Sequence, residues 1–237
     1  MTTPDEGPGG PQASQLRVER SPRRLAAIGA GVALLLVAGL GVLVTLRGLS
    51  EESLDAEWME EIVEHRSPIW EVPARVFDFI GTGWFGIFLV PIAVAVAFLI
   101  ARRPWAAGAF VIGSAVSSGV VQLMKVVFGR DRPEEILLSL ESGSFPSGHV
   151  ANAATVVTLL ALLLRRTWIG IAGAVYVVLM ALSRTYLGAH WVTDTIGGAL
   201  VGAAMATLVW VAFAQKVRAE RPPRQRAIHT PPEQAEA

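Results

Sequence analysis

Residues 146–164 read PSGHVANAATVVTLLALLL, a short polar cluster followed directly by a mostly apolar run. Proline and serine are favoured where helices begin, so Pro146-Ser147-Gly148-His149 is expected to form the first turn of a helix whose body is Val150 to Leu164. A run this rich in Val, Leu and Ala is typical of a helix inside a lipid bilayer. The stretch therefore predicts a membrane helix that begins at a polar rim.

The rest of the chain is apolar enough to supply a bundle of such helices. Hydrophobic residues make up 52% of the sequence and charged residues 17%, which is too apolar a balance for an ordinary soluble domain. A bilayer core needs about 20 apolar residues per helix, and backbone groups left unpaired in lipid are strongly unfavourable. The candidate stretches are residues 25–46, 79–101, 104–125, 149–164, 168–185 and 191–214. The expected fold is all-α, an integral membrane bundle of six transmembrane helices over residues 25–214.

Residues 51–64, between the first two apolar stretches, have a helical pattern of a different kind. Leu54, Trp58 and Ile62 recur at i, i+4 and i+8, which places them on one face of an otherwise acidic segment. This pattern predicts an interfacial helix that lies along the membrane surface with Trp58 as an anchor. A gate or lid over a site is the alternative interpretation.

The basic residues are unevenly distributed and orient the bundle through the positive-inside rule. Of the 20 basic residues, 13 fall on one predicted side: Arg17, Arg20, Arg23, Arg24, Arg102, Arg103, Arg165, Arg166, Lys216, Arg218, Arg221, Arg224 and Arg226. Residues 1–24 and 215–237 are expected to be a disordered arm and a disordered basic tail, both cytoplasmic. We expect a multi-pass protein of the cell membrane, and the high use of Ala, Arg, Gly and Val indicates a bacterial source.

Three polar clusters stand at the opposite, extracytoplasmic ends of the predicted helices. They are Lys125-Val-Val-Phe-Gly-Arg-Asp-Arg132-Pro133, Pro146-Ser147-Gly148-His149, and Ser183-Arg184 followed by His190 and Asp194. The spacing K-x6-R-P, P-S-G-H and S-R-x5-H-x3-D resembles the three-part signature of the type 2 phosphatidic acid phosphatase superfamily. Every position of the signature is filled, and the resemblance extends over roughly residues 81–214.

The resemblance implies a metal-independent phosphatase that hydrolyses a lipid phosphate or pyrophosphate. By this resemblance His190 is the nucleophile that forms a phosphohistidine. Asp194 lies four residues further on, where it is expected to accept the N–H of one ring nitrogen and leave the other nitrogen free to attack phosphorus. His149 is expected to protonate the leaving oxygen and later to activate water.

A phosphate group near lipid needs fixed cations to hold it and to stabilise the transferring oxygens. Lys125, Arg132 and Arg184 are the candidates, although a lone cation at a membrane edge more often extends toward headgroups. At the expected helix start, the Ser147 hydroxyl is a further donor and Gly148 lets the backbone come close to phosphate oxygens. The same amides serve an ordinary helix cap, and the two roles are compatible.

Two histidines and an aspartate are also plausible zinc ligands, so a metal site is the main chemical rival. The surrounding Lys and Arg side chains would repel a dication, and we expect neither a metal nor another cofactor. The chain has no cysteine, and its 20 basic and 20 acidic residues give no overall field to attract nucleic acid. The expected partners are the bilayer and a lipid phosphate; the pattern does not indicate an oligomeric state.

The motifs do not specify the lipid. A polyprenyl pyrophosphate such as undecaprenyl pyrophosphate is the preferred hypothesis, with phosphatidic acid or phosphatidylglycerol phosphate as alternatives. Vanadium-dependent haloperoxidases share the signature, but they are typically soluble, which the six apolar stretches argue against. A non-catalytic lipid-binding protein on this scaffold would be expected to lack a motif His or Arg, and none is missing.

Overall fold

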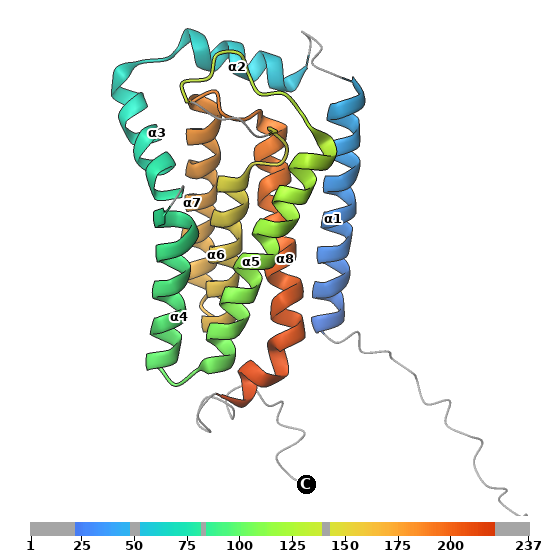
Figure 1. The fold of residues 1–237 in the computed structure, drawn as a ribbon, viewed down its shortest axis with the longest axis vertical. Coiled ribbons are helices and arrows are strands. Elements are labelled where there is room, and N and C mark those ends of the chain that lie inside the picture. The colour runs from blue at the N-terminus through green and yellow to red at the C-terminus, as the bar shows by residue number, and fades with distance from the viewer. Residues whose placement is uncertain (1–21, 48–52, 82–83, 139–142, 221–237) are drawn as a thin grey trace, which may run out of the picture.

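A computed structural model describes residues 22–47, 53–81, 84–138 and 143–220 of the chain, and no strand occurs among them (Figure 1). The long helices run side by side: α1 (Pro22–Arg47), α4 (Val90–Ile100), α5 (Pro104–Phe128), α6 (Gly148–Leu164), α7 (Thr167–Tyr186) and α8 (Val192–Ala219). The helix α2 (Leu54–Glu64) lies across one end of this bundle, and α3 (Pro68–Gly81) leads back along its side (Figure 1). The all-helical expectation is confirmed.

The helix α6 packs against α5, α7 and α8. Its side chains Val150, Leu159 and Leu163 are fully buried. The outward faces of the other helices carry long apolar side chains that are mostly exposed, among them Leu46 and Val126. Such an exterior suits contact with lipid tails, because it places no unpaired polar group in hydrocarbon.

Glycines on α8 allow it to contact α6 backbone to backbone. A Cβ atom on Gly198 would lie 2.4 Å from the carbonyl oxygen of Ser147, and one on Gly202 would lie 2.2 Å from that of Ala151. Side chains at both positions are therefore excluded by the neighbouring main chain. Small residues four apart are the usual means of close helix packing in membranes. This contact sets the start of α6 beside the start of α8.

Four helices, α1, α5, α7 and α8, are long and apolar enough to cross a membrane, and the bent pair formed by α3 and the segment after it raises the number to five. The apolar helix α6 is shorter than the other candidates. The expectation of six spans thus corresponds to six apolar regions, but their crossing of a bilayer stays a prediction.

The expected single helix over residues 79–101 is not continuous. The helix α3 ends at Gly81, a wide π-helical turn, η1, covers Trp84–Leu89, and α4 follows from Val90. The axis of α3 and the axis of the following helical segment, Phe85–Ile100, differ in direction by 47°. Pro91 explains part of the irregularity, since it has no N–H to donate to the preceding turn.

Other boundaries differ less. The helix α1 already begins at Pro22, inside the expected disordered arm, and α8 continues to Ala219, past the expected end at residue 214. The remaining parts of the predicted arm and tail, residues 1–21 and 221–237, lie outside the described residues, as do residues 51 and 52 of the predicted interfacial segment. From Leu54 to Glu64 that segment is helical, and the Ser53 side chain accepts a hydrogen bond from the amide of Ala56 at 3.2 Å. Its position at a membrane interface stays a prediction.

Replacing Gly202 tests the contact between α6 and α8. We expect Gly202→Ala to lower the free energy of unfolding by about 1–3 kcal/mol, because the added methyl group overlaps the Ala151 carbonyl. Gly119→Ala on α5 is the matched control, since nothing lies within 4 Å of its added Cβ. Thermal unfolding in detergent measures both. Equal stability of the two variants would contradict the packing argument.

Candidate active site

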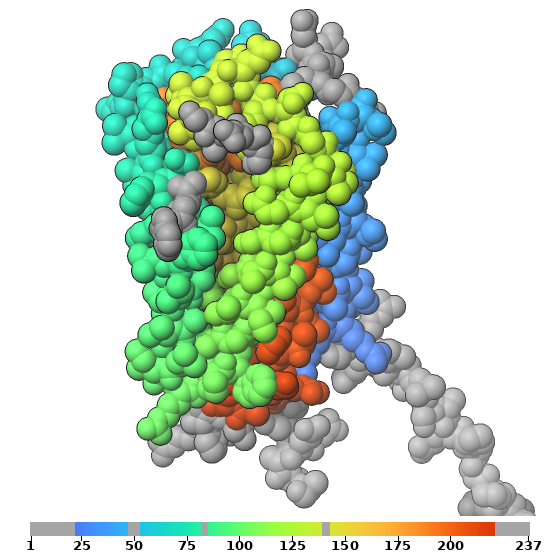
Figure 2. Space-filling model, in the orientation of Figure 1, coloured from blue at the N-terminus to red at the C-terminus, as the bar shows by residue number. Residues whose placement is uncertain are grey.

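The polar clusters of the sequence come together at the end of the bundle where α2 lies. Six of the eight predicted site residues line one cavity of about 290 Å³: Lys125, Arg132, Gly148, His149, Arg184 and His190. They come from the end of α5, the loop after it, the start of α6, the end of α7 and the turn before α8. The side of the bundle that faces the viewer in Figure 2 has a hollow between α5 and the side formed by α3 and α4. The three motifs thus meet at one end of the bundle, and the expectation that this end is extracytoplasmic stays a prediction.

The other two predicted residues lie directly behind the cavity. Asp194 is fully buried on the first turn of α8, and His190 precedes that helix, which begins at Val192. His190 Nδ1 lies 3.5 Å from Asp194 Oδ2, so the two predicted partners are neighbours, although only one of them is in the helix. Nδ1 has no hydrogen-bond partner within the part of the chain that the structure describes, so the expected hydrogen bond stays a prediction. Ser147 is fully buried as the N-cap of α6, and its hydroxyl has no hydrogen-bond partner among the described residues.

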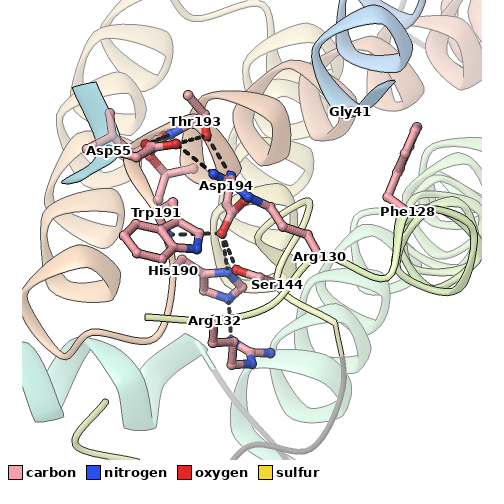
Figure 3. A network of polar contacts seen from close by, with 12 residues as sticks. Gly41, Asp55, Phe128, Arg130, Arg132, Ser144, His190, Trp191, Thr193 and Asp194 are labelled. Atoms are coloured by element: carbon pink, nitrogen blue, oxygen red, sulfur yellow. Dashed lines mark hydrogen bonds and ion pairs between the residues drawn. The ribbon is translucent and has the colours of Figure 1, made fainter. Parts of the chain in front are cut away.

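The two ring nitrogens of His190 have different surroundings (Figure 3). Nδ1 faces Asp194, and Nε2 lies 3.4 Å from the Arg132 guanidinium, which lines the cavity. Burial lowers the pKa of the imidazole to about 3; Asp194 opposes this shift, and Lys125 adds to it. The ring is therefore neutral near pH 7, with its proton directed at the carboxylate and a lone pair on the side of the cavity.

The three predicted cations surround the same cavity. Lys125 donates to the carbonyl of Gly143, and Arg132 donates to the carbonyl of Ala189. Burial, reinforced by repulsion from Arg184, lowers the pKa of the Arg132 guanidinium. Positive groups held this close together without acidic groups in the cavity wall are suited to an anion with several oxygens.

A residue that the sequence analysis missed, Asp78 on α3, links two of the predicted ones. Its Oδ1 lies 3.3 Å from His149 Nε2 and accepts a hydrogen bond from Arg184 Nη1. The Nε and Nη2 atoms of Arg184 are buried and have no hydrogen-bond partner in the described part of the chain. These two N–H groups form the parallel edge with which arginine binds phosphate.

A second group that the sequence analysis missed surrounds Asp194. Arg130 Nη1 donates to Asp194 Oδ1 at 2.6 Å, and the Trp191 amide donates to Oδ2 at 2.9 Å. The Ser144 hydroxyl also donates to Oδ2, and Arg130 reaches Asp55 on α2 (Figure 3). Arg130 lies inside the first motif at a position that the signature leaves variable, and no local pattern marked Asp55 or Ser144.

Among the described residues, one group of acidic and histidine side chains lies close enough together to share a metal ion. Glu61, Glu64 and His65 on and next to α2 form such a group, and all three are exposed, as acidic surface groups often are. His149, His190 and Asp194 do not form one. The cavity, which Lys125, Arg132 and Arg184 line, is suited to an anion.

The His190 ring state is directly measurable. The pKa of His190 in the folded protein lies below the ordinary value of about 6.5, so folding favours the neutral ring. The neutral ring makes its full contribution to the free energy of unfolding above about pH 6.5, and this contribution is lost as the pH falls below 6.5. We expect ¹⁵N NMR of histidine-labelled protein at pH 5.5 to show His190 neutral with the proton on Nδ1. A doubly protonated ring at that pH would contradict this assignment; His190→Gln identifies the signal.

Comparison with known proteins agrees with the site. A family model of the PAP2 superfamily matches residues 105–218. Decaprenylphosphoryl-5-phosphoribose phosphatase of Mycobacterium tuberculosis is 30% identical over 197 residues, which cover 81% of this chain and 92% of that protein. Phosphatidylglycerophosphatase B of Bacillus subtilis is 32% identical over 143 residues, covering 55% of this chain and 70% of the relative.

The fold is also similar to a solved structure. The crystal structure of a transmembrane PAP2 type phosphatidylglycerolphosphate phosphatase from Bacillus subtilis superposes with a TM-score of 0.69 at 25% sequence identity. The superposition covers 79% of this chain and 96% of that one. With all three signature clusters gathered at one cavity and the relatives matched over most of their length, the chain belongs to the PAP2 superfamily.

Proposed function

We propose that this protein is an integral membrane phosphatase that hydrolyses a lipid phosphate or pyrophosphate through a phosphohistidine intermediate. The observation that carries the proposal is the placement of His190, with Nδ1 toward the buried Asp194 and Nε2 toward a cavity lined by Lys125, Arg132 and Arg184. A neutral imidazole oriented in this way is a competent nucleophile at the edge of an anion site.

In the first step, the His190 Nε2 lone pair attacks phosphorus. An N–P bond forms, the bond from phosphorus to the leaving oxygen breaks, and His149 gives its proton to that oxygen. In the second step, His149 takes a proton from water, whose oxygen attacks phosphorus. An O–P bond forms, the N–P bond breaks, and phosphate leaves a neutral His190. Asp194 stabilises the positive imidazole in the intermediate, since its carboxylate oxygen lies 3.5 Å from Nδ1.

The phosphoryl oxygens would be held by groups that converge on the cavity from different helices. Arg184 offers its Nε and Nη2 edge, while Asp78 holds the third nitrogen and thereby fixes the direction of the guanidinium. Lys125 and Arg132 supply further positive charge, and Ser147 and Gly148 bring the amide-rich start of α6. The same cations offset the charge that develops in the transition state.

We further propose six spans with both termini in the cytoplasm and the site on the extracytoplasmic side. Apart from Arg47, Arg66 and Arg75, which lie between the end of α1 and α3, the described basic residues outside the motifs gather at the bundle end opposite α2: Arg23, Arg24, Arg102, Arg103, Arg165, Arg166, Lys216 and Arg218. That end is the lower one in Figure 1, where α1 begins and α8 ends. The positive-inside rule favours the cytoplasm for it.

A polyprenyl pyrophosphate is the proposed preferred substrate. A cavity at the rim of the bundle lies at headgroup depth, so a long lipid presents its phosphate while its tail stays in the bilayer. The hollow between the α3–α4 side and α5 supports entry from the side (Figure 2). The relative that covers 81% of this chain is named for a decaprenyl lipid, and the two Bacillus proteins are named for phosphatidylglycerol phosphate, which is the alternative substrate class with phosphatidic acid.

The roles of the histidines make different predictions for two variants. His190→Ala is expected to abolish both turnover and covalent labelling by a ³²P-labelled substrate. His149→Ala is expected to lower kcat by about 10²–10⁴-fold, the usual contribution of a general acid. In this variant His190 is still expected to become labelled, but at a lower rate. Quenched-flow labelling with acid-labile, base-stable phosphate detection measures both. An active, folded His190→Ala protein contradicts the mechanism.

Sidedness is testable without background, because the chain has no cysteine. Glu134→Cys lies in the exposed loop near the site, and Arg166→Cys lies in the exposed turn at the opposite end. A membrane-impermeant maleimide applied to intact cells is expected to label the first variant alone and to label both after lysis. The reverse pattern would place the site in the cytoplasm.

Substrate class is decided by competition in detergent between undecaprenyl pyrophosphate, phosphatidylglycerol phosphate, phosphatidic acid and a short soluble phosphate ester. The highest kcat/KM is expected for the polyprenyl pyrophosphate, with the soluble ester lowest because it lacks the membrane anchor. Preference for the soluble ester would overturn the lipid assignment.

Chelators are expected to leave activity intact, and vanadate is expected to inhibit. Activity that is lost in chelator and restored by zinc or magnesium would favour the metal alternative.

A further inference from the structure

One carboxylate of the helix α2 is buried, although this helix lies outside the region that the family model matches. Asp55 is 5% exposed, whereas Glu57 in the same first turn is exposed. Ionised carboxylates are rarely buried unless they are paired. A buried Asp55 therefore needs hydrogen-bond donors or a cation beside it, and the groups that supply them lie at the active-site end of the molecule.

Asp55 holds two different elements of the site (Figure 3). Its Oδ2 accepts from Arg130 Nη2 at 2.8 Å and from the Thr193 hydroxyl at 2.6 Å. Its Oδ1 accepts from the Thr193 backbone amide at 2.9 Å. Thr193 is in the first turn of α8, so Asp55 caps this helix from another part of the chain.

Arg130 stands between two carboxylates. Its Nη2 is paired with Asp55, and its Nη1 donates to Asp194 at 2.6 Å and to the Thr193 hydroxyl at 2.7 Å. All three charged side chains are buried, with 6% of Arg130, 5% of Asp55 and none of Asp194 exposed. Solvent screens charges weakly at such positions.

The charges of this group decide what Asp194 can do for His190. Arg130 alone would cancel the charge of Asp194 at close range, because a single cation and a single carboxylate sum to zero. Asp55 supplies a second negative charge, so the three side chains together carry one negative charge. A positive imidazole forms on His190 when its Nε2 bonds to phosphorus, and it is stabilised by that remaining charge.

We propose that Asp55 is a positioning residue for the phosphoryl-transfer step: it offsets the charge of Arg130, so that Arg130 orients Asp194 without neutralising its effect on His190. The inference rests on the proposed phosphohistidine mechanism. It also makes α2 a fixed support behind the site, since Asp55 joins this helix to both the loop after α5 and the start of α8.

The variant Asp55→Asn keeps the shape of the side chain and removes its charge. We expect kcat on the best lipid phosphate to fall about tenfold or more, as with other residues that orient a histidine from behind, and KM to stay within about twofold because Asp55 does not line the cavity. Glu57→Gln removes the same charge from the same helix turn and is expected to keep the wild-type kcat. Unchanged kcat in a folded Asp55→Asn protein would overturn the proposal.

A double variant separates the charge argument from a purely structural role. Asp55→Asn combined with Arg130→Gln restores one net negative charge at Asp194, so its kcat is expected to exceed that of Asp55→Asn. A structural role predicts that the two losses add, and a folded double variant that is no better than the single one would contradict the proposal. If Asp55→Asn fails to fold, the double variant alone tests the proposal, because it leaves no unpaired cation behind. Its kcat is then expected to stay well above the kcat of Asp194→Asn. A double variant whose kcat is as low as that of Asp194→Asn would overturn the proposal.

The ring of His190 gives a readout that needs no turnover. We expect the ¹⁵N and proton signals of Nδ1–H to shift in Asp55→Asn and to stay unchanged in Glu57→Gln. If the wild-type protein releases phosphate from no lipid, the proposed function fails while this measurement still reports on Asp55. If the wild-type protein is active and the Nδ1–H signals are the same in both variants, the inference about Asp55 fails by itself.

Discussion

The close contact between α6 and α8 is the constraint on which the site depends. Gly198 and Gly202 let α8 touch the main chain of α6, and the Ser147 amide donates to the Asp194 carbonyl at 2.9 Å where the two helices begin. Because the contact is between backbones, the spacing of the two helix starts varies little with side-chain rotamers. His149 on the first turn of α6 and His190 in the turn before α8 therefore line the same cavity.

A buried charge is the second organising feature. Asp194 has no exposed surface, and removing a carboxylate from water is unfavourable unless its oxygens are paired. Its partners come from the loop after α5, the turn before α8 and, through Arg130, from α2. This pairing fixes the ionised carboxylate behind His190, and the cations Lys125, Arg132 and Arg184 lie on the cavity side. The imidazole thus stands between a region that favours positive charge and one that favours an anion.

The segment from α2 to α3 contains two carboxylates that are linked to the two histidines, one through Arg130 and one directly. Asp55 acts on His190 through Arg130, and Asp78 lies against His149 and Arg184. Both residues precede residue 105, where the family match begins. The motifs thus contain the cations and histidines that line the cavity, while the groups that orient them come partly from a helix across the end of the bundle and a helix along its side.

Apolar runs and motif spacing determined much of this protein without a structure. Helix positions followed from uninterrupted hydrophobicity, which acts over neighbouring residues, and the eight motif residues followed from spacings within short segments. His190 and Asp194 were expected to pair on one helix face; they do lie together, although His190 is in the turn before α8. Asp55, Asp78 and Ser144 were not found, since each meets its partner across 50 residues or more and no local period marks such a pair. The break after Gly81 was also missed, because hydropathy reports how apolar a segment is and not whether its helix is continuous. Local chemistry determined which residues were available, and the packing of α2, α3, α6 and α8 decided which of them share charge with the histidines.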